Sequence, residues 1–155
     1  MKIHIIQIGK TKDKNIAELV SEYIKRTSPY AKVEFRTLNE EKLTSSKTKE
    51  KIIQIEGEKI LKNISSEFIV ALDEKGEQFS STDFAEIIKK QKDAGQKITF
   101  IIGGAFGLSN DVKAKANLTL SLSKMTFTHE MVRLFLMEQV YRAFSIIAGK
   151  GYHNE

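Results

Sequence analysis

The chain has 155 residues, 41% of them hydrophobic, and it contains no cysteine. This length fits a single domain over residues 1–155 with a hydrophobic core of its own, and the lack of cysteine excludes a disulfide framework or a cysteine-based metal or redox centre. Lysine and arginine number 25 against 20 aspartates and glutamates, a formal charge of +5, which favours an anionic partner such as nucleic acid but also suits many lysine-rich proteins. No apolar stretch of the sequence reaches the length of a membrane span, so we expect a cytoplasmic protein without a membrane partner.

The first part of the chain predicts two strands around one helix. The apolar run of residues 3–8 predicts a buried strand. Asp13 can cap a helix in which the apolar side chains of residues 16–24 fall on one face, and Pro29 ends that helix. Apolar and charged residues alternate over residues 32–36, which predicts a half-exposed strand at a sheet edge.

A lysine-rich helix is predicted over residues 44–63, with capping candidates between Thr44 and Thr48. The lysines of this region are Lys42, Lys47, Lys49, Lys51, Lys59 and Lys62. A row of lysines is usually a solvated helix face, and the alternative is a surface that follows RNA phosphates.

A continuous apolar run at residues 68–72 predicts a central strand that is buried on both sides and ends at Asp73. A turn at residues 74–76 then leads to a helix that is capped near Ser80 or Ser81.

The remaining elements continue this alternation. Residues 98–102 predict a second buried strand, 111–116 a short helix, 118–122 a last strand and 128–148 a long helix. Strands that alternate with helices indicate an α/β domain with a mostly parallel sheet and helices on both faces.

A glycine-rich turn, residues 103–107 (Gly-Gly-Ala-Phe-Gly), follows a buried strand. Its spacing matches neither a dinucleotide-binding fingerprint nor a P-loop, and an ordinary turn is the alternative to a ligand site. Position favours the ligand site, because ligands of open α/β sheets bind at the carboxyl ends of strands, and Leu72, Gly104 and Ser123 each end a predicted strand.

The segment of residues 122–128, between the last strand and the last helix, is unusually apolar for a loop. Loops normally face water, so an apolar one covers a core or lines a pocket. Met125 and Phe127 could flank an aromatic base there.

The last predicted helix is apolar on nearly all sides, which predicts burial from several directions. A homodimer interface explains this burial, and a central helix of a monomer is the alternative. Glu138 and Arg142 are spaced i, i+4 and can form an ion pair; alternatively, Arg142 binds a phosphate.

The three histidines, His4, His129 and His153, have no zinc-ligand spacing, and we expect no metal site. The tail of residues 149–155 has the composition of a disordered end. Its two glycines before Tyr152 and His153 would also suit a flexible lid that carries a ring and a titratable group.

Together these C-terminal segments resemble the RlmH family, the bacterial large-subunit ribosomal RNA pseudouridine methyltransferases of the knotted SPOUT superfamily. The resemblance rests on residues 102–108, 120–129, 132–133, 138–143 and the terminal Tyr-His, and it extends over the whole chain. Two positions depart from it: Thr128, where a proline is expected before the histidine, and Gly151, where a proline is common.

The resemblance implies a deep C-terminal trefoil knot, a homodimer, and S-adenosylmethionine bound in the knot as methyl donor. It implies methylation at N3 of a pseudouridine in 23S ribosomal RNA of the large subunit, within the assembled ribosome. The residues that it assigns to the donor are Leu72, Gly104, Ser123, Lys124, Met125, Thr126, Phe127 and Thr128.

Methyl transfer to an imide nitrogen requires the loss of a proton, which a general base assists. Our hypothesis is that His153 or a neighbouring carboxylate accepts this proton and that Arg142 and Tyr152 position the RNA. Two other functions compete with this one: a non-catalytic ribosome- or RNA-binding module, and a nucleotide-binding protein that uses the glycine-rich turn. Neither explains the apolar loop.

Overall fold

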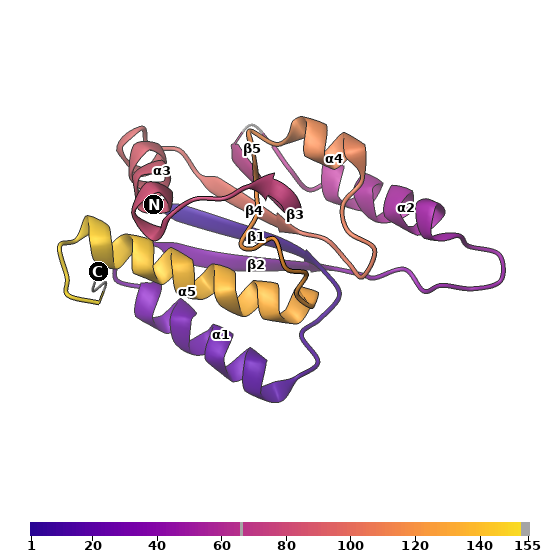
Figure 1. Ribbon diagram of the computed structural model, residues 1–155, viewed down its shortest axis with the longest axis horizontal. Coiled ribbons are helices and arrows are strands. Elements are labelled where there is room, and N and C mark those ends of the chain that lie inside the picture. Colours follow the sequence, from indigo (N-terminus) through magenta and orange to yellow (C-terminus); the bar gives the residue numbers. More distant parts are fainter. Residues whose placement is uncertain (66, 153–155) are drawn as a thin grey trace.

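The computed structural model describes residues 1–65 and 67–152, and its centre is a parallel β-sheet (Figure 1). The sheet has five strands in the order β2-β1-β4-β3-β5, and all neighbouring strands are parallel. The strands are β1 (Lys2–Ile8), β2 (Lys32–Leu38), β3 (Phe68–Glu77), β4 (Ile98–Ile102) and β5 (Leu118–Leu120). The helices are α1 (Lys14–Thr27), α2 (Lys49–Leu61), α3 (Ser81–Asp93), α4 (Asn110–Lys115) and α5 (His129–Ile147).

Helices cover both faces of the sheet, as predicted. On one face, α1, α3 and α5 bury a large apolar cluster, and on the other α2 and α4 bury a smaller one. Alternation along β1 supplies both clusters, because Ile3 and Ile5 point to the first face and Ile6 and Ile8 to the second. Each such isoleucine contributes about 1.5–3 kcal/mol when fully buried. The α/β class is therefore confirmed, with β2 at a sheet edge.

Short polar side chains begin the helices. Asp13 accepts hydrogen bonds from the backbone N–H groups of Asn15 and Ile16 at the start of α1, and Ser80 accepts one at the start of α3. Both caps are confirmed predictions. Thr128, one of the two departures from the family pattern, caps α5 through the backbone N–H of Met131.

Strand β3 is longer than predicted, and the predicted turn at residues 74–76 is wrong. The strand continues to Glu77 and changes register, so that Leu72 and Glu77 both pair with Leu120 of β5. Gly76 suggested the turn, yet it marks a close approach of two backbones: a Cβ there would lie 2.5 Å from the carbonyl oxygen of Thr119.

Two smaller boundaries also differ from the predictions. Strand β5 ends at Leu120, two residues before the predicted end, and the N–H of the next residue, Ser121, donates to the carbonyl of Glu77 at the end of β3. Helix α2 begins at Lys49 with Thr48 as its cap, because Thr44 and Lys47 form a small bridge of their own.

Helix α5 lies on the sheet beside α1 and α3 (Figure 1). These neighbours, together with the sheet, bury Leu136, Met137, Val140, Ala143 and Phe144 of α5 within one chain. A single chain therefore buries more of this helix than its sequence pattern alone led us to expect.

The beginning of α1 is also held by α5. The Glu130 carboxylate accepts hydrogen bonds from the backbone N–H groups of Lys12 (2.9 Å) and Asp13 (3.1 Å). A side chain from the last helix thus satisfies the N–H of the N-cap residue Asp13 and that of the residue before it.

Candidate functional site

A cavity of about 670 Å³ lies at the carboxyl edge of the sheet. Three segments supply most of its lining: residues 72–75 of β3, residues 102–108 at the end of β4 and after it, and most residues between Leu120 and Val132. Lys113 of α4 also lines it. The strand ends that the sequence singled out therefore converge on one cavity, as the topological rule for open α/β sheets predicts.

Most of the residues that the family resemblance assigns to the donor line this cavity. They are Leu72, Gly104, Ser123, Met125, Thr126, Phe127 and Thr128. Lys124 is not among the lining residues, and its side chain is exposed.

The wall after β4 is a turn of close backbone approaches. Gly107 has φ +84°, which favours glycine, and its N–H donates to the carbonyl of Gly104 at 3.1 Å. A Cβ on Gly103 would lie 2.9 Å from the Gly107 backbone. The glycines thus bring bare backbone to the cavity surface.

The segment after β5 is held by its own hydroxyl groups. Ser121 Oγ donates to the carbonyl of Ser123 (2.9 Å), and Ser123 Oγ accepts from the Met125 N–H (2.9 Å). Thr126 Oγ1 donates to the Glu74 carboxylate of the neighbouring strand β3. The loop is therefore held to the β3 segment of the cavity.

The same loop presents apolar side chains. Met125 is 74% exposed and Phe127 39% exposed, and the Phe127 ring packs on Phe135 of α5 with centroids 5.0 Å apart. The apolar loop thus lines a pocket, as its composition predicted, and leaves part of this surface open.

The cavity lining also contains charged and titratable residues that were not predicted for the site, among them Asp73, Glu74 and His129. Asp73 binds Lys113 Nζ at 3.0 Å and accepts from the Lys75 N–H at 2.9 Å. Burial raises the pKa of Asp73, but these hydrogen bonds outweigh it and lower the pKa. Glu74 lines the cavity next to Asp73, and His129 lines it from the start of α5, where burial and then the charge of Arg133 lower the pKa of its imidazole.

Arg133 is a fully buried cation that supports this edge of the sheet. Its guanidinium donates to the carbonyls of Ile8 (2.8 Å) and Gly9 (2.9 Å) and to the Thr11 hydroxyl (2.9 Å). The sequence showed only an arginine in an apolar helix, and its acceptors lie more than 120 residues away in the chain.

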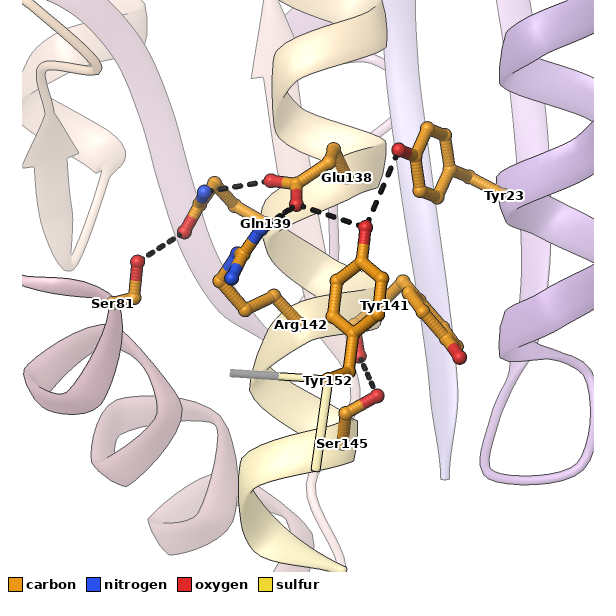
Figure 2. Close-up of polar contacts among 8 residues, drawn as sticks. All are labelled: Tyr23, Ser81, Glu138, Gln139, Tyr141, Arg142, Ser145 and Tyr152. Atoms are coloured by element: carbon orange, nitrogen blue, oxygen red, sulfur yellow. Dashed lines mark hydrogen bonds and ion pairs between the residues drawn. The ribbon is translucent and has the colours of Figure 1, made fainter. Parts of the chain in front are cut away.

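Arg142 and Tyr152 belong to a second polar group, which Figure 2 shows on the outer side of α5. Arg142 Nε donates to Glu138 Oε1 at 3.0 Å, which confirms the i, i+4 ion pair. Tyr152 OH lies 3.3 Å from the same oxygen and 3.5 Å from Tyr23 OH. The Tyr152 ring packs edge-on against Tyr141 and also lies 4.8 Å from the Arg142 guanidinium carbon.

Tyr152 is partly buried in this group. Burial, then the hydrogen bond with Tyr23, raises the pKa of its hydroxyl, so the phenol stays protonated near neutral pH. The start of the tail therefore packs back on its own chain. His153 lies outside the described residues.

A smaller cavity of about 380 Å³ adjoins the first one. The two share Leu120, Leu122, Ser123 and Phe127, and Glu138 lies on the wall of the smaller one. Gln139 links this wall to α3, because its amide donates to Glu138 (2.7 Å) and accepts from Ser81 (2.9 Å). The structure thus brings the Glu138 group beside the first cavity, although Arg142 and Tyr152 line neither.

The lysine-rich region is less basic than its sequence indicates. Glu41 binds the ammonium groups of both Lys47 and Lys59, and these hydrogen bonds lower the pKa of Glu41 to about 2. Lys49 lies over the ring of Phe106 in the glycine-rich turn, 5.6 Å from its centroid. A phosphate-binding role for the remaining lysines stays a prediction.

Within residues 1–65 and 67–152, no cluster of three or more His, Asp or Glu side chains could bind a metal ion. No helix in that part of the chain is long and apolar enough to cross a membrane. His4 lies between Glu34 (3.3 Å) and Glu67 (3.7 Å), in keeping with a structural role.

The chain matches the family model described as predicted SPOUT methyltransferase over residues 1–153. It is 44% identical to the ribosomal RNA large subunit methyltransferase H of Carboxydothermus hydrogenoformans over 158 residues, which cover 99% of both chains. The protein of that name from Streptococcus gordonii is also 44% identical over 158 residues, again with 99% of each chain covered.

Solved structures show the same fold at low sequence identity. A probable methylase family protein from Haemophilus influenzae is 14% identical, with a TM-score of 0.62 over 99% of this chain and 70% of that one. The tRNA (m1G37) methyltransferase of Aquifex aeolicus is 17% identical, with a TM-score of 0.56 over 92% of this chain and 70% of that one. The chain therefore belongs to the SPOUT methyltransferase family, among the proteins named ribosomal RNA large subunit methyltransferase H.

Proposed function

We propose that this protein transfers a methyl group from S-adenosylmethionine to 23S ribosomal RNA, at N3 of a pseudouridine in the assembled ribosome. One observation carries the proposal: three strand ends meet in one cavity whose lining includes seven of the eight residues predicted for the donor. Relatives that are 44% identical over their full length carry the name of a large-subunit ribosomal RNA methyltransferase, which supports this substrate class and a place in the cytoplasm, where ribosomes work.

The residues of the larger cavity fit the proposed donor. A volume of about 670 Å³ lies in the usual range for a ligand of this size. Gly103 and Gly104 offer backbone groups, Met125 and Phe127 offer apolar surface for a purine ring, and Asp73 offers carboxylate oxygens for hydroxyl or ammonium groups. When bound, the donor supplies a methyl group that its sulfonium already activates.

The smaller cavity is the proposed place for the acceptor base. It shares the Phe127 loop with the donor cavity, so a base inserted there would lie next to the donor. Phe127 and Phe135 offer rings for stacking, and the bound base must leave its RNA stack to reach them. The protein then acts mainly by aligning the two reactants.

The Glu138 group provides the chemistry that the acceptor requires. The imide nitrogen must lose a proton as it gains the methyl group. Glu138, on the wall of the smaller cavity, and His153, in the tail, are the two proposed proton acceptors. Arg142 and Tyr152 hold the Glu138 carboxylate through the contacts in Figure 2 and position the RNA.

We further propose that the active form is a homodimer with a knotted C-terminal segment, as the family resemblance implies. Partly exposed apolar side chains support the dimer: Met125 and Phe127 in the loop, and Met131, Phe135 and Tyr141 on α5. A second copy that covers part of this surface would remove apolar area from water.

Two measurements test the proposed function. Calorimetry with S-adenosylhomocysteine tests the donor cavity, and we expect binding without any RNA. Mass mapping of 23S ribosomal RNA tests the substrate: ribosomes from cells that lack the gene should lose one methyl group on a pseudouridine, and the purified protein should restore it. Full activity on a short free RNA hairpin would contradict the requirement for an assembled ribosome. No binding of S-adenosylhomocysteine at high concentration would instead favour a non-catalytic RNA-binding module.

A further inference from the structure

The carboxyl group of Glu56 is buried behind the glycine-rich wall of the larger cavity. This residue of α2 is only 3% exposed. Its Oε1 accepts from the Glu41 N–H at 2.9 Å, and its Oε2 has no hydrogen-bond partner among the described residues. Burial raises the pKa of Glu56 in spite of the Glu41 hydrogen bond. A buried carboxyl oxygen without a partner destabilises a fold, so the stability of α2 does not explain this side chain.

The position of Gly104 indicates what Glu56 contacts. A Cβ on Gly104 would lie 2.7 Å from Glu56 Oε2 and 3.1 Å from Ile8 Cγ2. The front of Gly104 lines the cavity, so its back packs against the Glu56 carboxyl group. At the next residue, a Cβ on Gly57 would lie 2.3 Å from Ser109 Oγ. Helix α2 therefore packs closely against Gly104 of this wall and against Ser109, which follows it at the start of α4.

Glu56 also contacts the loop between β2 and α2, residues 39–48, which extends away from the sheet in Figure 1. The contact is the hydrogen bond from Glu41, whose own carboxylate binds Lys47 and Lys59. Lys59 also donates to the carbonyl of Asn39 at 3.0 Å. One buried side chain thus joins the base of a charged loop to the glycine-rich wall.

We propose that Glu56 is a positioning residue for the methyl donor: its side chain supports Gly104 from behind and joins this wall of the donor cavity to the loop of residues 39–48. The inference rests on the proposed function, which places the donor in front of Gly104. Glu56 does not touch the donor. Without its support the wall moves away from the cavity, so the donor binds less tightly, while methyl transfer at saturating donor proceeds as before.

The first test compares three variants by calorimetry with S-adenosylhomocysteine and by kcat and KM on ribosomes. Glu56→Gln keeps the shape and the acceptor for Glu41, so we expect donor affinity within about twofold of wild type. Glu56→Ala removes the support, and we expect donor affinity to fall at least about fivefold, which is a typical lower limit for coupling between sites. The value of kcat should change little. Glu56→Asp shortens the side chain with less loss of volume and serves if alanine prevents folding.

A double-mutant cycle tests the contact itself. Gly104→Ala should weaken donor binding, because the new methyl group meets the Glu56 carboxyl and pushes the wall toward the cavity. Adding Glu56→Ala, or Glu56→Asp, opens that space and should recover part of the affinity. Gly103→Ala is the matched control, because its methyl group would meet the Gly107 backbone, which no change at Glu56 can relieve.

Each outcome decides for or against the proposal. Equal donor affinity in wild type and Glu56→Ala, or a loss in Gly104→Ala that neither change at Glu56 reduces, overturns it. A fall in kcat at saturating donor with unchanged affinity overturns it as well. The failure of wild type itself to bind S-adenosylhomocysteine overturns the proposed function and this role together, so the two failures are distinguishable.

Discussion

Replacement of the buried Arg133 by methionine should cost a large part of the free energy of unfolding. Methionine keeps most of the apolar volume but removes the donors to the carbonyls of Ile8 and Gly9. An acceptor left without its partner in a buried place costs about 1–3 kcal/mol, so two cost about 2–6 kcal/mol. Methionine avoids the cost of burying a charged guanidinium, which offsets part of this loss. We therefore expect the free energy of unfolding to fall by about 2–4 kcal/mol.

Thermal unfolding followed by circular dichroism measures this loss. In a chain of this size each kcal/mol lowers the unfolding midpoint by about 2–4 °C, so Arg133→Met should unfold roughly 5–15 °C below wild type. The unfolding midpoint of Arg133→Lys should lie between those of wild type and Arg133→Met, because one ammonium group cannot replace the planar guanidinium at three acceptors.

Arg26→Met is the control, because Arg26 makes an exposed ion pair with Glu22; its midpoint should stay within about 1 °C of wild type. An Arg133→Met protein as stable as this control would refute the role that we assign to the buried hydrogen bonds.

The remaining predictions concern the two cavities and acid stability. Phe127→Ala should weaken S-adenosylhomocysteine binding by about 5–30-fold in calorimetry, because it removes a cavity ring, whereas Phe127→Leu should lose less; equal losses would argue against an aromatic contact. Tyr152→Phe keeps the ring but loses the hydroxyl contacts to Glu138 and Tyr23, so kcat on ribosomes should fall about tenfold with donor affinity unchanged; an unchanged kcat would contradict a positioning role. Glu41 has its pKa lowered to about 2, so its stabilising effect is complete above its ordinary pKa and is lost as pH falls toward 2. The free energy of unfolding, measured in urea, should therefore fall more between pH 6 and pH 3 for wild type than for Glu41→Gln. Equal falls in the two proteins would disprove the linkage.

The fold was predictable because its determinants are local. Apolar runs such as residues 98–102 and caps such as Asp13 and Ser80 act over a few residues. Strand β3 was harder, because Gly76 is explained by its contact with Thr119, which lies far along the chain. A glycine that permits close approach and a glycine in a turn are indistinguishable in a single sequence.

In the candidate site, the residues that line the cavity were predictable, but the residues that support them from behind were not. The family resemblance gave the residues of the donor cavity, and all of them except Lys124 line it. Glu56 and Arg133 were not singled out for a role, because each acts through partners that only the folded chain brings near, such as Gly104 for Glu56 and Ile8 for Arg133. A polar residue inside an apolar helix is the trace that Arg133 leaves in the sequence, whereas Glu56 lies among the other charged residues of α2 and leaves none.

The contacts between the two ends of the chain have a consequence for the order of folding. The N–H groups of Lys12 and Asp13, just before α1, are satisfied by Glu130, and the carbonyl of Ile8 at the end of β1 is satisfied by Arg133, so both ends depend on a helix that begins at His129. During synthesis the amino-terminal strand and helix leave the ribosome long before those partners exist. Contacts of such long sequence separation slow folding, so we expect the amino-terminal quarter to stay loosely packed until the last helix docks, and hydrogen exchange of a newly released chain would show both ends becoming protected together.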